Sequence, residues 1–414
     1  MKRIKVNFVL SIMLLSVLFI FPGCNDSDGE MTPDMPVEGV EMFTPITSFP
    51  TAKPNPVLGS DGRYHIVYEL QITNVTSLTW IINSIDILDG NSDKVFAVIS
   101  GDEVKSKIQT ISSRLPINSL DPDRSALVFL TFSVESVEDI PANLNHRLNV
   151  TVPGGIPEGF ANFVGIPTDA DEYAEFTGFL EVNPPDAILL GPPLSGDRWV
   201  AADGCCSAVR HVRGYNAING KIFFAQRFAI DWEKLNEDKR IFVGDPQDLN
   251  SYFCYGEDVI AVSDATVVTV LNGLEDQVPG QLPSGIPLEE ADGNHVVLDL
   301  GSGRYALYAH LIKDSITVEA GDKVTTGQLL GLVGNSGNSL APHLHFHVMD
   351  SPLTLGSNGL PYMYDKYELI EMSASTEAFD LAEATGIPLE TVPVDNPGPQ
   401  TDNLMLDQSI VNFE

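Results

Sequence analysis

The chain has 414 residues, more than one ordinary domain holds, so we expect two folded units with connectors. Its formal net charge of −34 opposes contact with phosphate backbones and anionic headgroups, which excludes nucleic acid as an expected partner and also excludes direct adsorption to a membrane surface. The 34 glycines, the 28 prolines and the short apolar runs favour turn-rich β-structure.

The amino terminus has the pattern of a bacterial export signal. Basic residues at positions 2, 3 and 5 precede an apolar run over 6–21, and the sequence Phe-Pro-Gly-Cys then ends at Cys24. This pattern resembles a lipobox, which implies a lipoprotein signal peptide over 1–24 and a lipid on Cys24; a plain signal peptide is the alternative. We therefore expect a cell-envelope protein, lipid-anchored to a bacterial membrane on its periplasmic or extracellular face, which touches the membrane through the lipid alone.

The next two segments are a tether and a first folded body. Residues 25–42 hold acidic residues and prolines without lysine or arginine, which predicts an acidic flexible tether. Residues 43–182 alternate β-branched and aromatic runs with turn clusters, which predicts an antiparallel β-sandwich. The expected strands are Tyr64–Asn74, Ser84–Leu88, Lys94–Ser100, Ala126–Val134 and Arg147–Val152. Because no catalytic set of residues occurs here, we interpret this body as a spacer or as an interaction domain for an envelope protein.

A Pro-rich joint over 183–198 separates this sandwich from a second β-rich body over 199–372. An acidic C-terminal tail over 373–414 is expected to contain a helix at Thr376–Ala384 and an edge strand at Ser409–Phe413. The strands expected in the second body are Ile222–Trp232, Val259–Leu271, His295–Leu300, Tyr305–His310, Leu329–Val333 and His343–Met349. The predicted fold class is therefore all-β.

The cysteines do not form a disulfide framework. Apart from Cys24, the chain has Cys205, Cys206 and Cys254, which permit one disulfide at most. A bond from Cys254 to Cys205 or to Cys206 is expected in an oxidising compartment, and the sequence leaves the pairing open.

The clearest chemical pattern is the strictly alternating run His343-Leu344-His345-Phe346-His347. In a strand, side chains at i and i+2 point to the same face, so the three histidines form a column while Leu344 and Phe346 face the core. Neutral imidazole is the commonest protein ligand for zinc. The column can therefore direct imidazoles at a metal ion and at its substrate.

A hydrolytic zinc also needs a carboxylate or a further imidazole, and it keeps one position open for water. Asp231 is the best candidate, because it is the lone acid at the end of the apolar run Phe228-Ala229-Ile230, where burial without a partner would be costly. A turn-initiating aspartate is the alternative.

Residues 200–367 resemble the lysostaphin/LytM-type metallopeptidases, peptidase family M23. The resemblance covers about two-fifths of the chain and does not extend to the sandwich. The matching pieces are Ala229-Ile230-Asp231, Tyr255–Val262, Gly293–Val297, Tyr308–Leu311, Gly321–Gln328, Gly334–Gly337 and Pro342–Phe346. The resemblance implies an antiparallel β-sheet peptidase domain and a Zn²⁺ cofactor.

The resemblance also implies roles for individual residues. Asp231 and His345 match the family's aspartate and late-strand histidine ligands, whereas His343 and His310 match two catalytic histidines that flank the metal. We expect His343 to transfer protons and His310 to support the oxyanion. In hydrolysis by metal-activated water, imidazoles near the metal can perform these two tasks.

Two positions depart from the family pattern. The family usually has a histidine ligand four residues before the aspartate, and Arg227, which stays protonated and cannot bind zinc, stands there instead. His347 stands where the family commonly has glutamate. His211, upstream in the chain, is our preferred substitute for the missing ligand; His347 is the other candidate, and both His347 and Arg227 are possible accessory residues.

The sequence therefore predicts a zinc metalloendopeptidase that acts on peptide stems or crossbridges of peptidoglycan. One rival is a catalytically degenerate relative that binds peptidoglycan or activates another hydrolase, and Arg227 motivates this alternative. Carbohydrate binding by both β-bodies is a third hypothesis.

Overall fold

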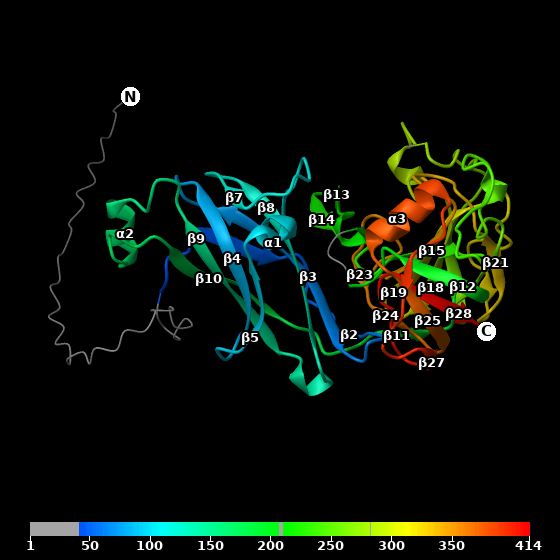
Figure 1. The fold of residues 1–414 in the computed structure, drawn as a ribbon, viewed down its shortest axis with the longest axis horizontal. Coiled ribbons are helices and arrows are strands. Elements are labelled where there is room, and N and C mark those ends of the chain that lie inside the picture. The colour runs from blue at the N-terminus through cyan, green and yellow to red at the C-terminus, as the bar shows by residue number, and fades with distance from the viewer. Residues whose placement is uncertain (1–40, 207–209, 282) are drawn as a thin grey trace, which may run out of the picture. The chain divides into compact units, whose positions relative to one another are not determined.

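The computed structural model describes residues 41–206, 210–281 and 283–414, which belong to one compact unit. The predicted signal peptide, its Cys24 and the tether up to residue 40 lie outside these ranges. The predicted all-β class is confirmed, with antiparallel sheets throughout most of the chain (Figure 1). Among the described residues, no helix has the length and apolar character needed to cross a bilayer.

The first body is a sandwich of two antiparallel sheets, as predicted. One sheet has the strand order β1-β3-β8-β6, with β2 on β3, and the other has the order β10-β9-β4-β5, with β7 on β4. The strands are β1 (Ile46–Pro50), β2 (Val57–Leu58), β3 (Tyr64–Asn74), β4 (Trp80–Asp89), β5 (Val95–Ser100), β6 (Ile108–Thr110), β7 (Ser119–Leu120), β8 (Ser125–Val134), β9 (Asn143–Thr151) and β10 (Tyr173–Glu181). The predicted strand Tyr64–Asn74 is confirmed as β3, and the other four expected strands lie within one or a few residues of the observed bounds.

The sandwich core lies between these sheets. Alternate residues of β3 and β8, such as Ile66 and Leu130, are buried there with Trp80 and Ile85 of β4. Short helices α1 (Asp102–Lys107) and α2 (Glu158–Val164) and the 3-10 turn Val137–Asp139 connect the strands. The alternation in the sequence is therefore what places one face of each sheet in the core.

One buried acid makes the sandwich pH-sensitive. Glu175 on β10 accepts a 3.1 Å hydrogen bond from the Ile46 N–H through Oε2, and burial raises the pKa of its carboxyl to about 8. Between roughly pH 4.5 and pH 8 the folded chain therefore keeps a proton that the unfolded chain has released, so this group's contribution to stability falls as the pH rises.

Glu175→Gln is expected to remove that pH dependence. The free energy of unfolding of the variant, relative to wild type, should rise by about 2 kcal/mol between pH 5.5 and pH 7, because each unit of pKa shift corresponds to roughly 1.4 kcal/mol. Urea titrations of both proteins at the two pH values measure this difference. Other titrating groups contribute equally to the two proteins, so their effects cancel when the free energies of unfolding are subtracted. A difference that does not change with pH would contradict the prediction.

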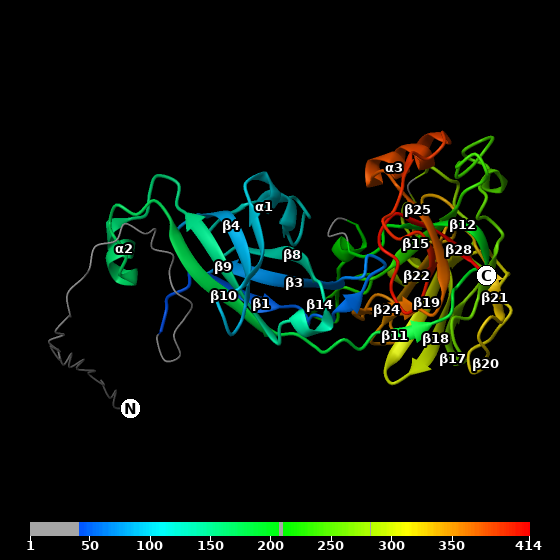
Figure 2. The ribbon, with the colours of Figure 1, turned by 60° about the horizontal axis from the view of Figure 1, so that its bottom comes forward.

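The second body is organised around a long sheet of twelve strands. Its main path is β20-β17-β18-β19-β22-β15-β12-β28-β25-β26, with β23 on β22 and β27 on β25, and Figure 2 shows β17, β18, β19 and β22 side by side. The strands are β12 (Gly196–Ala202), β15 (Ile230–Lys234), β17 (Ala265–Leu271), β18 (Asn294–Gly301), β19 (Arg304–Leu311), β20 (Lys323–Val324), β22 (Leu344–Met349), β23 (Gly359–Leu360), β25 (Tyr367–Ser373), β26 (Thr391–Val392), β27 (Gly398–Gln400) and β28 (Ser409–Phe413).

Smaller pairs flank this sheet. They are β11 (Ile188–Leu190) with β24 (Tyr362–Tyr364), β13 (Asn216–Ile218) with β14 (Lys221–Phe223), and β16 (Asp258–Ile260) with β21 (Leu329–Leu332). The remaining elements are the helix α3 (Thr376–Thr385) and 3-10 turns at His211–Arg213, Leu249–Ser251 and Leu288–Glu290.

Two of the expected strands are each divided into two. The run 222–232 forms β14 and β15 with a turn at 225–228, and the run 259–271 forms β16 and β17 with a break after Ile260. In both places the apolar residues are buried across a bend, and an apolar run has the same composition whether it is straight or bent. The first division matters for function, because it removes Arg227 from the alternation of β15.

The expectation of an acidic C-terminal tail was wrong. Residues 373–414 supply α3, β26, β27 and β28, and the predicted helix at Thr376–Ala384 is confirmed as α3. The strand Ser409–Phe413 is also confirmed, but it lies between β12 and β25 and is not an edge strand. Ile410 and Val411 are buried in the core, and this burial outweighs the acidic composition of the segment around them.

The expected disulfide to Cys254 was also wrong. Cys205 and Cys206 are bonded to each other, and Cys254 is a free, buried thiol. The Cys254 Sγ donates to the carbonyl oxygen of Pro342 at 3.0 Å, so it is held against the segment that enters β22.

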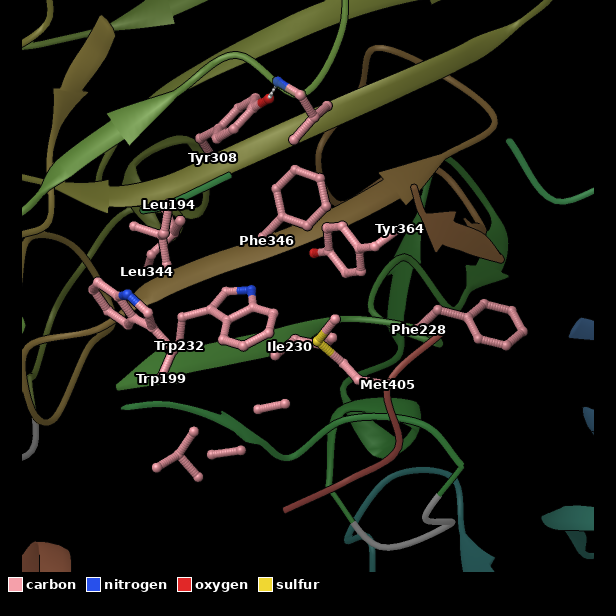
Figure 3. Close-up of a cluster of buried hydrophobic side chains, with 14 of the residues drawn as sticks. Leu194, Trp199, Phe228, Ile230, Trp232, Tyr308, Leu344, Phe346, Tyr364 and Met405 are labelled. Atoms are coloured by element: carbon pink, nitrogen blue, oxygen red, sulfur yellow. Dashed lines mark hydrogen bonds between the residues drawn. The ribbon is translucent and has the colours of Figure 1, made fainter. Parts of the chain in front are cut away.

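The core beneath the centre of the long sheet is aromatic. Trp232 and Ile230 of β15 and Leu344 and Phe346 of β22 are fully buried on the same side, together with Trp199 of β12 (Figure 3). Because neighbouring residues in a strand point to opposite faces, the residues between them, at 231 and 345, must face the other side of the sheet. The core therefore fixes the direction of the two side chains on which the site depends.

Candidate metal centre and active site

Asp231 and His345 lie side by side on adjacent strands. They are direct partners in the antiparallel pairing of β15 with β22, and the His345 Nδ1 is 2.7 Å from the Asp231 Oδ1. The two residues are 114 positions apart in the sequence, and the register of the strands brings them together. The predicted proximity of this carboxylate to the alternating histidines is therefore present in the fold.

His211 joins this pair from the turn His211–Arg213. Its Nε2 is 3.1 Å from the Asp231 Oδ2, and its ring lies 4.9 Å from that of His345, centroid to centroid. Its Nδ1 faces the backbone oxygens of Asp203 at 2.9 Å and Ala229 at 3.1 Å, so Nδ1–H donates to the backbone and Nε2 is left free to bind a metal. The structure thus places His211 beside Asp231, where it can replace the histidine ligand that is missing four residues before Asp231 in the sequence.

His343 and His310 flank the same carboxylate. The His343 Nε2 is 3.4 Å from the Asp231 Oδ1, and the rings of His343 and His310 are 4.8 Å apart. In each ring Nδ1–H donates to a backbone carbonyl at 2.8 Å, that of Ala341 for His343 and that of Ser336 for His310. Both rings therefore present Nε2 to the cavity that they line.

A close backbone contact holds His310 in place. His310 has a φ of +64°, which is rare for a residue with a side chain and typical of strained functional positions. A Cβ on Gly334 would lie 2.4 Å from the Ile312 backbone nitrogen, and one on Gly337 would lie 2.3 Å from the Gly293 nitrogen. Only glycine permits this approach, which brings the Ser336 carbonyl to the His310 ring.

His347 contacts His345 on the side away from Asp231. The His345 Nε2 and the His347 Nδ1 are 3.0 Å apart, and both residues are buried. With a metal ion on the His345 Nδ1, the Nε2–H of this ring would donate to the His347 Nδ1. His347 is therefore an acceptor that orients His345, a task that a glutamate can also perform.

The site has strong electrostatic coupling. Burial opposes the charge on Asp231, but His211, His343 and His345 hold the pKa of its carboxyl well below the usual range. Burial likewise lowers the pKa of His211, yet the Asp231 carboxylate outweighs it and raises that pKa to about 9. Burial lowers the pKa values of His310, His345 and His347, so these three rings are neutral at pH 7.

The donor set fits a zinc ion. His211, Asp231 and His345 each offer a ligand atom within 4.8 Å of the others, and so do His310, His343 and His345. Two imidazole nitrogens and one carboxylate make three protein ligands, the usual number in a catalytic zinc site with one position open for water. The backbone bond of His211 and the bond from His345 to His347 are the outer contacts that metal-binding histidines normally have.

Arg227 points away from this cavity. Its guanidinium makes a bidentate ion pair with Glu69 of β3, with Nε–Oε1 at 3.0 Å and Nη2–Oε2 at 2.7 Å, and Nη1 donates to the Gly359 carbonyl at 3.1 Å. The Glu69 carboxyl also accepts from the Thr51 hydroxyl at 2.9 Å. Both members of the pair are buried. Of the two possible accessory residues, His347 therefore contacts a candidate ligand, whereas Arg227 ties the turn before β15 to the sandwich.

Several acidic residues that line the cavity were missed by the sequence analysis. The cavity of about 300 Å³ is bordered by Asp203 after β12, Glu233 of β15, and Asp380 and Glu383 of α3. Glu233 had a usable signal, because it stands two residues after Asp231 on the same face of a strand. The two acids of α3 had none, since their position depends on a helix that was expected to lie in a tail.

The family comparison covers the later part of the site. Residues 252–355 match the model of peptidase family M23, a range that includes His310, His343, His345 and His347 but not His211 or Asp231. A curated relative, the peptidoglycan DD-endopeptidase ShyA of Vibrio cholerae, is 44% identical over 57 residues, which is 14% of this chain. The chain spans 13% of the length of that relative.

Solved structures of the same family also match. The catalytic domain of lysostaphin from Staphylococcus simulans is 23% identical, with 36% of this chain and 90% of that chain covered and a TM-score of 0.20. A catalytic-domain mutant of the prophage-encoded M23 protein EnpA from Enterococcus faecalis is 25% identical, with 31% and 92% covered and a TM-score of 0.16. The match to peptidase family M23 over residues 252–355 lies within the second body.

Proposed function

We propose that this protein is a zinc-dependent metalloendopeptidase that hydrolyses peptide bonds in the stems or crossbridges of peptidoglycan. The observation that carries the proposal is the meeting of His211, Asp231 and His345 at one point, with His343 and His310 beside them. The kind of bond is suggested by the short match to a peptidoglycan DD-endopeptidase.

His211 through Nε2, His345 through Nδ1 and the carboxylate of Asp231 would hold the zinc ion. A bound zinc ion supplies a water molecule of lowered pKa and a positive charge that polarises a peptide carbonyl. The protein contributes fixed ligand directions, because each of the two imidazoles has its other nitrogen engaged in a hydrogen bond.

His343 and His310 perform the proton and charge work. With Nδ1–H donated to the Ala341 carbonyl, His343 has its Nε2 lone pair free to accept a proton from the attacking water and to return it to the leaving amine. His310 lies 4.8 Å from His343, ring to ring, and its neutral ring, whose Nδ1–H is held by the Ser336 carbonyl, would have to take up a proton at Nε2 before it could donate to the oxyanion that forms on the carbonyl oxygen.

The setting is a bacterial cell envelope. A lipid on Cys24 would anchor the chain to a membrane, the tether would give it reach, and the sandwich would space the peptidase body or bind an envelope protein. The formal charge of −34 supports anchorage by lipid over adsorption to anionic headgroups.

The test is hydrolysis by purified protein with a defined metal content. We expect about one zinc per chain, release of new amino termini from purified peptidoglycan detected by mass spectrometry, loss of cleavage with a chelator, and recovery with added zinc. Zinc-loaded protein that cuts neither peptidoglycan nor isolated muropeptides would overturn the proposal and favour a degenerate, binding relative.

His347 provides a more specific prediction. His347→Ala is expected to weaken zinc binding by roughly 10- to 100-fold, because His345 loses the acceptor that fixes its ring. His347→Glu keeps an acceptor and should retain most of the affinity. Competition with a coloured chelator measures both values, and equal loss in the two variants would mean that His347 acts through packing alone.

A further inference from the structure

Of the three candidate zinc ligands, His211 alone lies outside a strand. Asp231 belongs to β15 and His345 to β22, and the pairing of these strands in the long sheet fixes the distance between the two side chains. His211 begins the 3-10 turn His211–Arg213, which we call the ligand turn. Strands hold functional side chains more precisely than loops do, so the ligand turn needs a support of its own.

The ligand turn points its three side chains in different directions. A 3-10 helix has three residues per turn, so successive side chains lie about 120° apart. The His211 ring faces the metal centre, and Val212 is buried in the core of the second body. Arg213 faces the sandwich, where its guanidinium donates to the Ser106 carbonyl oxygen and lies 5.1 Å from the centre of the Phe129 ring. The ligand turn therefore lies between the metal centre and the sandwich.

Tyr215 makes a second connection, two residues after the ligand turn. Its hydroxyl donates to the Ile111 carbonyl oxygen at 2.7 Å, and the Arg114 guanidinium donates to the Tyr215 carbonyl oxygen at 2.7 Å. The same guanidinium lies 4.7 Å from the centre of the Tyr215 ring, which is a cation–π distance. Ile111 and Arg114 follow β6, so the chain after the ligand turn is attached to the sandwich through its side chain and its backbone.

The sandwich sheet behind these contacts contributes to the core of the second body. Val67 of β3 and Leu127 and Phe129 of β8 are buried in the hydrophobic cluster of the second body. Phe129 lies 6.5 Å from Tyr215 and 6.3 Å from Phe224, ring to ring. A shared apolar core opposes relative motion of two domains, whereas a small polar interface permits it. The sandwich is therefore a firm support for the ligand turn.

The contacts made by the second body act on a different part of the ligand turn. The backbone oxygens of Asp203 and Ala229 accept from the His211 ring and set its direction. The sandwich contacts act on the residues that follow the ring and hold the chain that carries it. If the ligand turn were in place in only a fraction of the molecules, the apparent affinity for zinc would be reduced to that fraction.

We propose that the sandwich is a structural part of the metal centre, in which Arg213 and Tyr215 are positioning residues that hold the ligand turn. The sandwich then raises the affinity for zinc, a role beyond spacing the peptidase body or binding an envelope protein. This inference rests on the metal centre of the proposed function and is independent of the bond that is cut.

The first measurement is zinc affinity, by competition with a coloured chelator at a temperature far below the unfolding midpoint of each variant. Arg213→Ala is expected to weaken zinc binding by roughly 10-fold. Arg213→Lys keeps a donor and a charge near Ser106 and Phe129 and should recover part of this loss. Arg147→Ala is the matched control, because Arg147 bonds to Asp86 within the sandwich; it should lower stability and leave the zinc affinity unchanged.

A double-mutant cycle tests whether Arg213 acts through His211. In a His211→Ala background the turn carries no ligand, so adding Arg213→Ala should not weaken zinc binding further. Tyr215→Phe, which removes the hydroxyl bond to Ile111 and keeps the ring, should show a smaller loss with the same dependence on His211. Equal losses in the two backgrounds would mean that Arg213 acts on the whole body, and this result would overturn the inference.

The affinities also separate this inference from the proposed function. If zinc-loaded wild type does not cut peptidoglycan, the proposed function fails and the affinities still decide the inference. If wild type binds no zinc, both fail. If wild type cuts peptidoglycan and Arg213→Ala binds zinc as tightly as wild type does, only the inference fails.

Discussion

His345→Ala is expected to lower peptidoglycan hydrolysis by at least ~10³-fold and to reduce the zinc content of the purified protein to a small fraction of one per chain. His345 is the one residue common to both groups of candidate ligands, and its Nδ1 lies 2.7 Å from the Asp231 carboxylate. Its removal leaves a carboxylate and one imidazole, too few ligands for a catalytic zinc site.

The measurement is metal content by plasma emission together with release of amino termini from peptidoglycan. His65→Ala is the matched control, since His65 pairs with Asp61 within the sandwich and is remote from the proposed chemistry. If the His345 variant keeps full activity at unchanged zinc content, the assignment of the metal centre is wrong.

The part of the site that the sequence could predict depends on a local rule. Alternation in β22 placed His343, His345 and His347 on one face, and an isolated acid in an apolar run singled out Asp231. Both inferences need only the strand period and the cost of burying a charge. The long sheet then brings the two segments together through the pairing of β15 with β22.

The parts that the sequence left open depend on contacts between distant residues. The sequence favoured His211 over His347 but could not settle the choice, because it depends on the backbone carbonyls of Asp203 and Ala229, which orient the His211 ring. The alternation rule also puts Arg227 and Asp231 on one face, and the turn at 225–228 cancels that rule. The sequence could not place Asp380 and Glu383 at the cavity, because their position requires that α3 belongs to the second body and not to a tail.

Arg227 motivated the alternative function, in which the protein is a catalytically degenerate relative. In the structure this arginine is the buried partner of Glu69, which lies 158 positions earlier in the chain. His211 lies against Asp231 and can serve as the ligand that the sequence lacks at position 227. Arg227 thus links the turn before β15 to the sandwich, and the candidate ligand beside Asp231 comes from the turn His211–Arg213. The metal content of Arg227 variants therefore separates a structural role from a catalytic one.

Arg227→Ala is expected to destabilise the folded protein by about 3–5 kcal/mol, because the truncation leaves the Glu69 carboxylate buried without its counter-charge. The pair replaced together, Arg227→Met with Glu69→Leu, removes both charges and should lie within about 1–2 kcal/mol of wild type. Urea unfolding at fixed pH measures the free energy of unfolding of wild type, the single variant and the double variant. Lys53→Ala, which breaks an exposed ion pair with Glu181, is the control and should change stability little.

Folded Arg227→Ala, measured well below its unfolding midpoint, should still bind zinc as wild type does, since the guanidinium contacts Glu69 and Gly359 and no candidate ligand. Activity should follow the folded fraction. Loss of zinc without loss of fold would instead place Arg227 among the residues that position the metal centre. The double variant restores stability without restoring the arginine, so its zinc content distinguishes the two roles. If Arg227 positions the metal centre, the double variant should contain little zinc. If Arg227 only links the sandwich to β15, the double variant should contain as much zinc as wild type.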